Sequence, residues 1–382
     1  MAGPVRFPRG LSTFAPRSVM GSYPISTSPS QIAMTEDFIP YRATDYTVTT
    51  AVAGTATSFP QMSGALKLAT SASATDTIFL ARNGQGFQFM PNNQMWFDMK
   101  LAYPRTVLNA NDTNIYLGMF DNAVPTSATN AIYFFKPAGS TAVQFIIKKA
   151  GTTTTFQNVA DLSIPSGLYG DTNSVNGTLT SVVTGGGFTG VSVATPGAGY
   201  QCSPLVLTTA ASGVAGNNIT TVGIGSTANT QSNPAVPVQS TALPYGSLYA
   251  PYAVTQGSGY TNTAGATTYL EVLPLIDLQF WYNGKDTLYV GVNGRQVMAI
   301  SATGTYGATA GGTYNLATSG VGPSFYATNT LATSVAPVLP ATGSPMHILP
   351  LTQMQIGFGM ANTTANIRTL YIDEYNCAVE LN

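Results

Sequence analysis

The clearest strand signals of the chain lie in EVLPLIDLQFWYNGKDTLYVGVNGRQVMAIS, residues 271–301. Two runs of β-branched and aromatic residues flank Asn283-Gly284, a pair typical of hairpin turns. A second pair, Asn293-Gly294, separates TLYVGV from RQVMAI in the same way. The stretch therefore predicts a three-stranded antiparallel meander.

The chain upstream of the insert described below, residues 41–164, carries the same kind of signal. It contains short strand-like runs with almost no helical periodicity between them: TDYTVTTAVA, GALKLAT, DTIFLAR, NIYLGMF, NAIYFFK and AVQFIIKK. In MWFDMKLAY the side chains alternate between two faces, as in a strand with one face buried. The mixed face holds Trp96, Asp98, Lys100 and Ala102, and the apolar face holds Met95, Phe97, Met99, Leu101 and Tyr103. Strands at such short, regular intervals indicate a β-sandwich.

The composition narrows the functional classes. The 382 residues include 44% hydrophobic residues, enough for a substantial core, which excludes disorder driven by charge. Only 8% of residues are charged, with 14 basic and 15 acidic, so we expect no nucleic-acid partner. No apolar run has the length of a membrane span, and the N-terminus lacks the apolar region of a signal peptide, so no membrane association is expected. A surface with so few charges tends to associate, which favours a subunit of a large assembly.

Residues 1–40 predict an extended N-terminal arm. Prolines along it forbid a continuous helix or a central strand: Pro4, Pro8, Pro16, Pro24, Pro29 and Pro40. Its first 35 residues carry basic and aromatic side chains and no acid: Arg6, Phe7, Arg9, Phe14, Arg17 and Tyr23. The arm is either a disordered terminus or a tether that folds onto a neighbouring subunit through those anchors. In an assembly subunit the tether is the favoured interpretation.

Residues 165–270 differ from the rest of the chain. They are rich in Gly, Thr and Ser, and Asp171 is the one charged residue between Pro165 and Leu270. TPGAGY at 195–200 and TQGSGY at 255–260 form a weak repeat, which predicts duplicated hairpins in an inserted β module. A flexible linker is the alternative, and strand-like segments such as SPLVLTT argue against it. After the meander, residues 301–345 predict a long loop, and MQIGFGMAN with NIRTLYIDEYNCAVE predicts two closing strands.

The order of these strands resembles the concanavalin-A-like (lectin/glucanase) jelly rolls of tailed-bacteriophage virion proteins. The matching positions are Trp96, Gly118, Tyr133-Phe134, Tyr282-Asn283-Gly284, Asn293-Gly294 and Tyr371-Ile372-Asp373. The repeat also resembles the GsGYts.P.v segments of phage structural proteins, with Ser203-Pro204 at the expected offset after the first copy. The resemblance implies an all-β, concanavalin-A-like jelly-roll sandwich, formed by residues 41–164 and 271–382, with the arm and the inserted Gly/Thr-rich β module as additions. Its motifs are loose and concern the fold.

Enzymatic chemistry finds little support in the residues. A glycosidase would need two carboxylates facing each other across a cleft, and Asp373 and Glu374, as strand neighbours, are expected on opposite faces. Asp277 and Asp286 flank a hairpin and are expected at strand ends. His347 is the single histidine, which removes most acid–base schemes. We therefore expect no enzyme.

Metal and cofactor chemistry has no motif either. The chain has no HExxH or CxxC, and the NANDTN loop at 109–114 has a single carboxylate, so no metal and no cofactor are expected. Cys202 and Cys377 read as two small buried residues, and whether they pair stays open.

A lectin remains the alternative to a subunit of an assembly. Four tyrosines crowd a segment without charge: Tyr245, Tyr249, Tyr252 and Tyr260. They suit either a host-surface glycan or an interface with a neighbouring subunit, and the interface is favoured because tyrosine is enriched there.

Together these observations predict a non-enzymatic phage virion protein, assembled in the host cytoplasm. The favoured role is a capsid decoration or cement protein that binds the major capsid protein through its arm and sandwich base, and itself as a homo-oligomer such as a trimer. A compact sandwich, a basic tether and the lack of coiled-coil heptads favour decoration over a tail role. The alternative is a carbohydrate-binding adhesion or tail-appendage module.

Overall fold

The computed structural model describes sixteen segments of the chain. They are residues 11–12, 24–25, 31–59, 64–84, 86–90, 93–104, 112–184, 187–209, 220–225, 247–253, 269–284, 287–301, 304–306, 313–315, 328–330 and 349–380. Within them the structure is built from β-strands, with two short 3-10 helices, η1 (Ala43–Asp45) and η2 (Pro125–Ser127).

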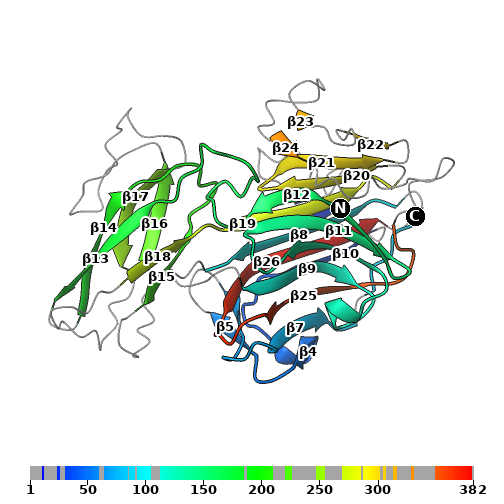
Figure 1. Ribbon diagram of the computed structural model, residues 1–382, viewed down its shortest axis with the longest axis horizontal. Coiled ribbons are helices and arrows are strands. Elements are labelled where there is room, and N and C mark those ends of the chain that lie inside the picture. Colours follow the sequence, from blue (N-terminus) through cyan, green and yellow to red (C-terminus); the bar gives the residue numbers. More distant parts are fainter. Residues whose placement is uncertain are drawn as a thin grey trace, which may run out of the picture.

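The first layer is a seven-stranded antiparallel sheet with the order β12-β11-β10-β9-β25-β7-β4. Figure 1 shows this sheet facing the viewer. Its strands are β4 (Tyr46–Thr50), β7 (Thr77–Arg82), β9 (Thr113–Phe120), β10 (Ala131–Lys136), β11 (Ala142–Lys149), β12 (Thr152–Asp161) and β25 (Gln355–Asn362).

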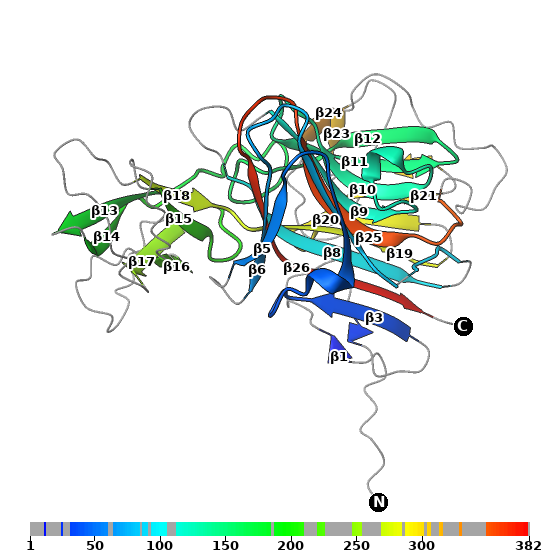
Figure 2. The same ribbon diagram turned by 90° about the horizontal axis from the view of Figure 1, so that it is seen from below.

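The second layer is a nine-stranded sheet, which lies behind the first and is separated from it in Figure 2. Its order is β22-β21-β20-β19-β8-β26-β6-β5, and β3 also pairs with β26. Its strands are β3 (Gln31–Glu36), β5 (Thr55–Phe59), β6 (Ala65–Ala69), β8 (Met95–Ala102), β19 (Ile276–Tyr282), β20 (Thr287–Val292), β21 (Arg295–Ser301), β22 (Gly304–Tyr306) and β26 (Thr369–Glu380). The predicted all-β, jelly-roll sandwich is therefore confirmed.

The main core lies between the two sheets. The apolar face predicted for β8 points into it, and Met95, Phe97, Met99 and Leu101 are each at most 1% exposed. Alternate residues of β25 and β9, such as Phe358 and Leu117, meet them from the other layer. Burying these side chains, at about 1.5–3 kcal/mol each, is the main force that holds the layers together.

The predicted meander is β19-β20-β21. Asn293 and Gly294 form its second turn with φ values of 51° and 72°, as a two-residue type I′ hairpin requires. The first connection is longer, because β19 ends at Tyr282 and β20 begins at Thr287. Asn283 closes it, since its side-chain oxygen accepts a hydrogen bond of 3.0 Å from the Thr287 amide.

The inserted region forms three separate strand pairs that project from one end of the sandwich (Figure 1). They are β13 (Thr178–Thr184) with β14 (Gly187–Thr195), β15 (Leu205–Thr209) with β18 (Tyr269–Leu273), and β16 (Thr220–Gly225) with β17 (Ser247–Ala253). A small core of Leu179, Tyr200, Val206 and Leu248 holds them together.

The first copy of the GxGY repeat has a structural role in this module. Gly197 and Gly199 have φ values of 63° and 91°, which favour glycine. The Tyr200 hydroxyl is buried and accepts a hydrogen bond of 2.9 Å from the Gly177 amide. The second copy, 255–260, lies outside the described residues.

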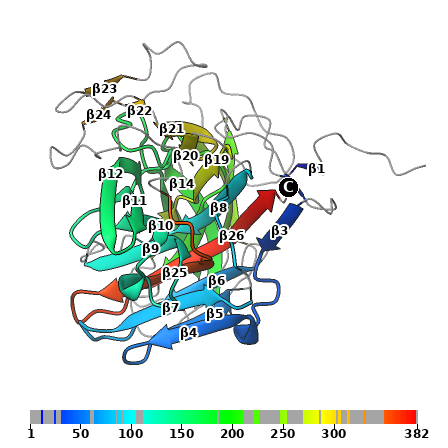
Figure 3. The same cartoon turned by 90° about the vertical axis from the view of Figure 1, so that its right-hand side faces the viewer.

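The sheet begins inside the segment that the sequence assigned to the arm. β3 pairs with the last half of β26, from Gln31 opposite Glu380 to Glu36 opposite Tyr375 (Figure 3). Phe38, 1% exposed, follows it into the core. The strand forms because residues 30–39 contain no proline and β26 extends beyond β6, which leaves an edge for β3 to pair with. Further upstream, β1 (Leu11–Ser12) pairs with β2 (Pro24–Ile25).

The region predicted as a long loop, 301–345, contains described strands as well. β22 extends the nine-stranded sheet, and β23 (Thr313–Asn315) pairs with β24 (Thr328–Thr330).

Candidate functional site

The outer face of the nine-stranded sheet gathers the chemically versatile side chains of the described residues. Cross-strand pairing of β19, β8 and β26 sets them in three rows. The rows are Asp277, Lys100 and Glu374; then Gln279, Asp98 and Asn376; then Trp281, Trp96 and Ala378. We call these residues, with Asp373, Tyr289 and Gln94 beside them, the polar-aromatic face. The alternation predicted for MWFDMKLAY put Trp96, Asp98 and Lys100 on one face of the strand, and these three are the members of the polar-aromatic face that lie on β8.

One row is an ion-pair cluster. The Lys100 ammonium lies 3.1 Å from an Asp373 oxygen and 3.6 Å from a Glu374 oxygen. Burial alone would lower the pKa of Lys100, but the two carboxylates outweigh it and raise that pKa. The expectation that Asp373 and Glu374 lie on opposite faces was wrong, because the pairing of β26 with β8 shifts register between Ile372 and Glu374.

Two aspartates lie within the same face. Burial raises the pKa of Asp277 to about 7, and burial together with the neighbouring Asp277 raises that of Asp98 well above its usual range. Asn376 donates a hydrogen bond of 2.8 Å to Asp98, and the Gln279 amide donates one to Asp277. The Oδ1 atom of Asp277 and the Oε1 atom of Gln279 are buried without a hydrogen-bond partner among the described residues.

Aromatic rings complete this face. Trp281 stacks on Tyr289, with ring centroids 4.8 Å apart and an angle of 19° between the planes. The Trp281 indole donates a hydrogen bond of 3.2 Å to Gln94, whose backbone is bonded to Glu380 at the end of β26. Trp96 and Trp281 are the two tryptophans of the chain.

The seven-stranded sheet carries a second group of aromatic side chains on its outer face. We call it the aromatic patch: Phe79, Tyr116, Phe120, Tyr133 and Phe135. Tyr116 is its centre, with ring centroids 5.7 Å from Phe79 and 4.9 Å from Phe135. Phe79 and Phe120 are buried, whereas Tyr116 and Phe135 are partly exposed.

Glycines let these rings lie on the sheet. A Cβ atom at Gly118 would approach the Tyr133 Cβ to 2.7 Å, and one at Gly359 would approach the Phe79 ring to 2.7 Å. The patch is therefore a flat apolar surface, whereas the outer face of an antiparallel sheet is commonly polar.

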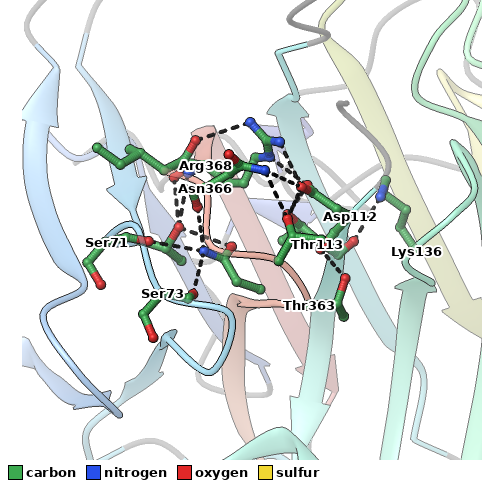
Figure 4. A network of polar contacts seen from close by, with 12 residues as sticks. Ser71, Ser73, Asp112, Thr113, Lys136, Thr363, Asn366 and Arg368 are labelled. Carbon is green, nitrogen blue, oxygen red and sulfur yellow. Dashed lines mark hydrogen bonds and ion pairs between the residues drawn. The ribbon is translucent and has the colours of Figure 1, made fainter. Parts of the chain in front are cut away.

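A polar network ties together the loops at one rim of the sandwich (Figure 4). Asp112 accepts hydrogen bonds of 2.5 and 2.7 Å from the Nε and Nη2 atoms of Arg368, and others from Thr364 and Asn366. The bonds from Arg368 hold the pKa of Asp112 well below its usual range. The carboxylate of Asp112 is bonded to Arg368, Thr364 and Asn366, all from the same chain, so this part of the network is structural.

Lys136 lies at the edge of the same network. It is 1% exposed, donates a hydrogen bond of 2.8 Å to the Thr113 carbonyl and sits 4.9 Å from the centre of the Tyr103 ring. Burial lowers its pKa to about 8. Sequence reasoning missed this residue, because a lysine ending the run AIYFFK reads as a solvated strand end.

Several residues singled out in the sequence, including the candidate binding residues of the arm, lie outside the described residues. These are the arm residues Arg6, Phe7, Arg9, Phe14, Arg17 and Tyr23, together with Tyr245, Tyr260, Asp286 and His347. Tyr249 and Tyr252 lie in β17, and the structure describes their backbone. Asp277 is the second residue of β19, at the strand end where it was expected. The structure has Cys202 and Cys377 as free thiols, and Cys377 is buried.

Within the described segments, no group of three or more His, Cys, Asp or Glu residues is placed to hold a metal ion. No helix in these segments has the length and apolar character of a membrane span.

No family model matches the chain, and no curated protein matches it. A solved structure that resembles it is a protein of unknown function from Shewanella oneidensis MR-1, with 9% identity and a TM-score of 0.37 over 93% of this chain and 89% of that one. The cellulose-induced protein Cip1 has 11% identity and a TM-score of 0.33, over 90% and 96% of the two chains. Peanut lectin has 8% identity and a TM-score of 0.33, over 92% and 98%.

Proposed function

We propose that this protein is a non-enzymatic structural subunit of a phage virion that decorates the assembled major-capsid lattice. The observation that carries the proposal is the aromatic side chains on the outer faces of both sheets. Trp281 and Tyr289 lie on one and Tyr116 and Phe135 on the other, at positions where a solitary sandwich commonly presents polar residues to water. Aromatic residues of this kind are enriched at protein interfaces.

The distribution of charge supports the same role. The chain has few charges, and several of those described are consumed internally, as in Asp112 with Arg368 and Lys100 with Asp373. A surface left nearly neutral costs little to desolvate against another protein. The proposal is non-enzymatic because the acids of the polar-aromatic face are ion-paired or hydrogen-bonded to neighbouring side chains.

The mechanism is stabilisation by mass action. A subunit that binds the assembled lattice, and not its free components, shifts the equilibrium toward the lattice. In this proposal the aromatic patch is the base of the sandwich, the surface that contacts the capsid shell. The arm, with Arg6, Arg9 and Arg17, adds a second attachment to the capsid protein. Homo-oligomers such as a trimer would multiply these weak contacts. The protein would be found in the virion.

Co-sedimentation with capsid shells that lack the protein tests the proposal. We expect saturable binding by the wild type and at least tenfold weaker binding by a Tyr116→Ser, Phe135→Ser variant, because the two rings form the exposed part of the patch. The matched control is Ile367→Ser, which removes an apolar side chain that is 62% exposed at the rim. Equal binding by all three proteins would remove the patch from the proposal, and no binding by the wild type would refute it.

A carbohydrate-binding adhesion or tail-appendage module is the second candidate. The stacked Trp281 and Tyr289, with Gln94 beside them, favour it, since a flat aromatic surface with amide groups suits a sugar ring. If this candidate is correct, a glycan array gives a defined hit, and the glycan that binds shifts the tryptophan emission of the protein in solution. A blank array together with shell binding would exclude it.

A further inference from the structure

The polar-aromatic face has more acceptors than its own residues use. Asp98, Asp277, Asp373 and Glu374 surround Lys100, the single basic side chain of the three rows. Asp277 Oδ1 and Gln279 Oε1 are buried without a hydrogen-bond partner among the described residues. A buried acceptor without a donor costs about 1–3 kcal/mol. The face is therefore suited to a guest that brings positive charge and several N–H donors.

The aromatic residues narrow the chemistry of that guest. Trp281 and Tyr289 form a stacked pair directly beside the row that contains Gln279 and Asp98. A guanidinium group is planar, always charged, carries five donors and stacks on aromatic faces, whereas an ammonium group makes point contacts. An arginine side chain can bond to the carboxylates and stack on the indole rings at the same time.

The chain itself supplies arginines close to this face. Residues 1–30 contain Arg6, Arg9 and Arg17, and no acid occurs before Glu36. The arm leads into β3 at Gln31, opposite Glu380, and Glu380 is bonded to Gln94 of the face. From β3 the sheet continues to β26, β8 and β19, a distance of about 15 Å at the usual strand spacing. The pairing of β1 with β2 shortens the reach of the arm as a whole, but the ten residues before β1, which hold Arg6 and Arg9, span up to about 35 Å when extended, which exceeds this distance.

We propose that the N-terminal arm, residues 1–30, folds back onto the polar-aromatic face of its own chain, with arginine side chains stacked on the indole rings and bonded to Asp98 and Asp277. The arm of the same chain is the occupant because a short tether gives it an effective concentration in the millimolar range. The contact is a latch in the unattached protein, from which the arm must be released before it binds elsewhere. It does not depend on the proposed capsid role, so the two can fail separately.

Tryptophan fluorescence of the full-length protein tests the latch, because both tryptophans lie on the face. We expect weak quenching by acrylamide in the wild type at low salt. An Arg6→Ala, Arg9→Ala, Arg17→Ala variant should at least double the quenching constant, and high salt should raise the wild type to the same value by screening the ion pairs. The matched control removes three positive charges elsewhere, with Arg42→Ala, Lys148→Ala and Lys149→Ala, and should quench like the wild type.

A second variant approaches the latch from the other side. Asp98→Asn with Asp277→Asn should expose the tryptophans as the arginine substitutions do. If this variant does not fold, the arginine variant still decides, because its substitutions precede the first strand of the large sheet. Equal quenching of wild type and arginine variant would overturn the proposal. Protection of the tryptophans from acrylamide that grows with protein concentration would also overturn it, since the arm of a second copy would then be the occupant. A glycan that shifts the tryptophan emission equally in both proteins would overturn it as well.

Discussion

The salt bridge between Asp112 and Arg368 should carry a large share of the stability of the sandwich rim. Its oxygens receive two bonds from Arg368 and one each from Thr364 and Asn366, and the side chains of Asp112 and Arg368 are 10% and 12% exposed. In Asp112→Asn the shape is kept, but the charge is lost and one of the two acceptor atoms becomes a donor. Arg368 is then left buried with an incomplete partner.

Removing one partner of a buried pair costs about 3–5 kcal/mol, and the slight exposure here sets the expected loss near the lower value, about 3 kcal/mol. Guanidinium chloride unfolding at pH 7 measures it as a lower midpoint with an unchanged slope. Because the pKa of Asp112 is lowered in the folded state, its stabilisation is present above the unfolded pKa of about 4 and is lost as the pH falls further. The difference between wild type and variant should therefore shrink in acid.

Asp37→Asn is the control for this experiment, because Asp37 is exposed and bonds the nearby Ile39 amide. Its effect should stay near zero to about 0.5 kcal/mol. A loss below about 1 kcal/mol in Asp112→Asn would show that the network adds little more than an exposed pair, and the reasoning would be refuted.

Two further predictions concern stability. Lys136→Met should abolish a gain in stability between about pH 8 and pH 10, which the wild type owes to its lowered lysine pKa; denaturant midpoints across that range measure it, and a persistent gain would contradict the assignment. Gly118→Ala should destabilise by about 1–3 kcal/mol, because its Cβ would lie 2.3 Å from the Ile132 carbonyl oxygen; an unchanged melting temperature would mean that the sheets shift freely to accept it.

The strands could be predicted where local pattern determines them. The meander of β19, β20 and β21 follows from two Asn-Gly pairs, and the buried face of β8 follows from strict alternation. β3 was not predicted, because it follows a proline-rich segment and its partner, β26, lies at the other end of the chain. No local signal marks a strand that forms through such a distant pairing.

Only part of the candidate site could be predicted from the sequence. Trp96, Asp98 and Lys100 were placed on one face by alternation, but their neighbours depend on the register with β19 and β26. The irregularity at Asp373 could not be foreseen, because a bulge depends on the partner strand as much as on its own residues. Lys136 shows the same limit, since its burial results from Tyr103 and the Thr113 carbonyl reaching it from elsewhere.

The proposed decoration of capsids depends above all on the stoichiometry of the purified protein on capsid shells that lack it. A saturating titration followed by sedimentation and mass analysis of the shells gives the number of copies bound. We expect saturation at a whole number of copies per symmetry unit of the shell, with the melting temperature of the shell raised as the sites fill. Shells that bind no protein, or that adsorb it without saturation and without a change in their stability, would contradict it.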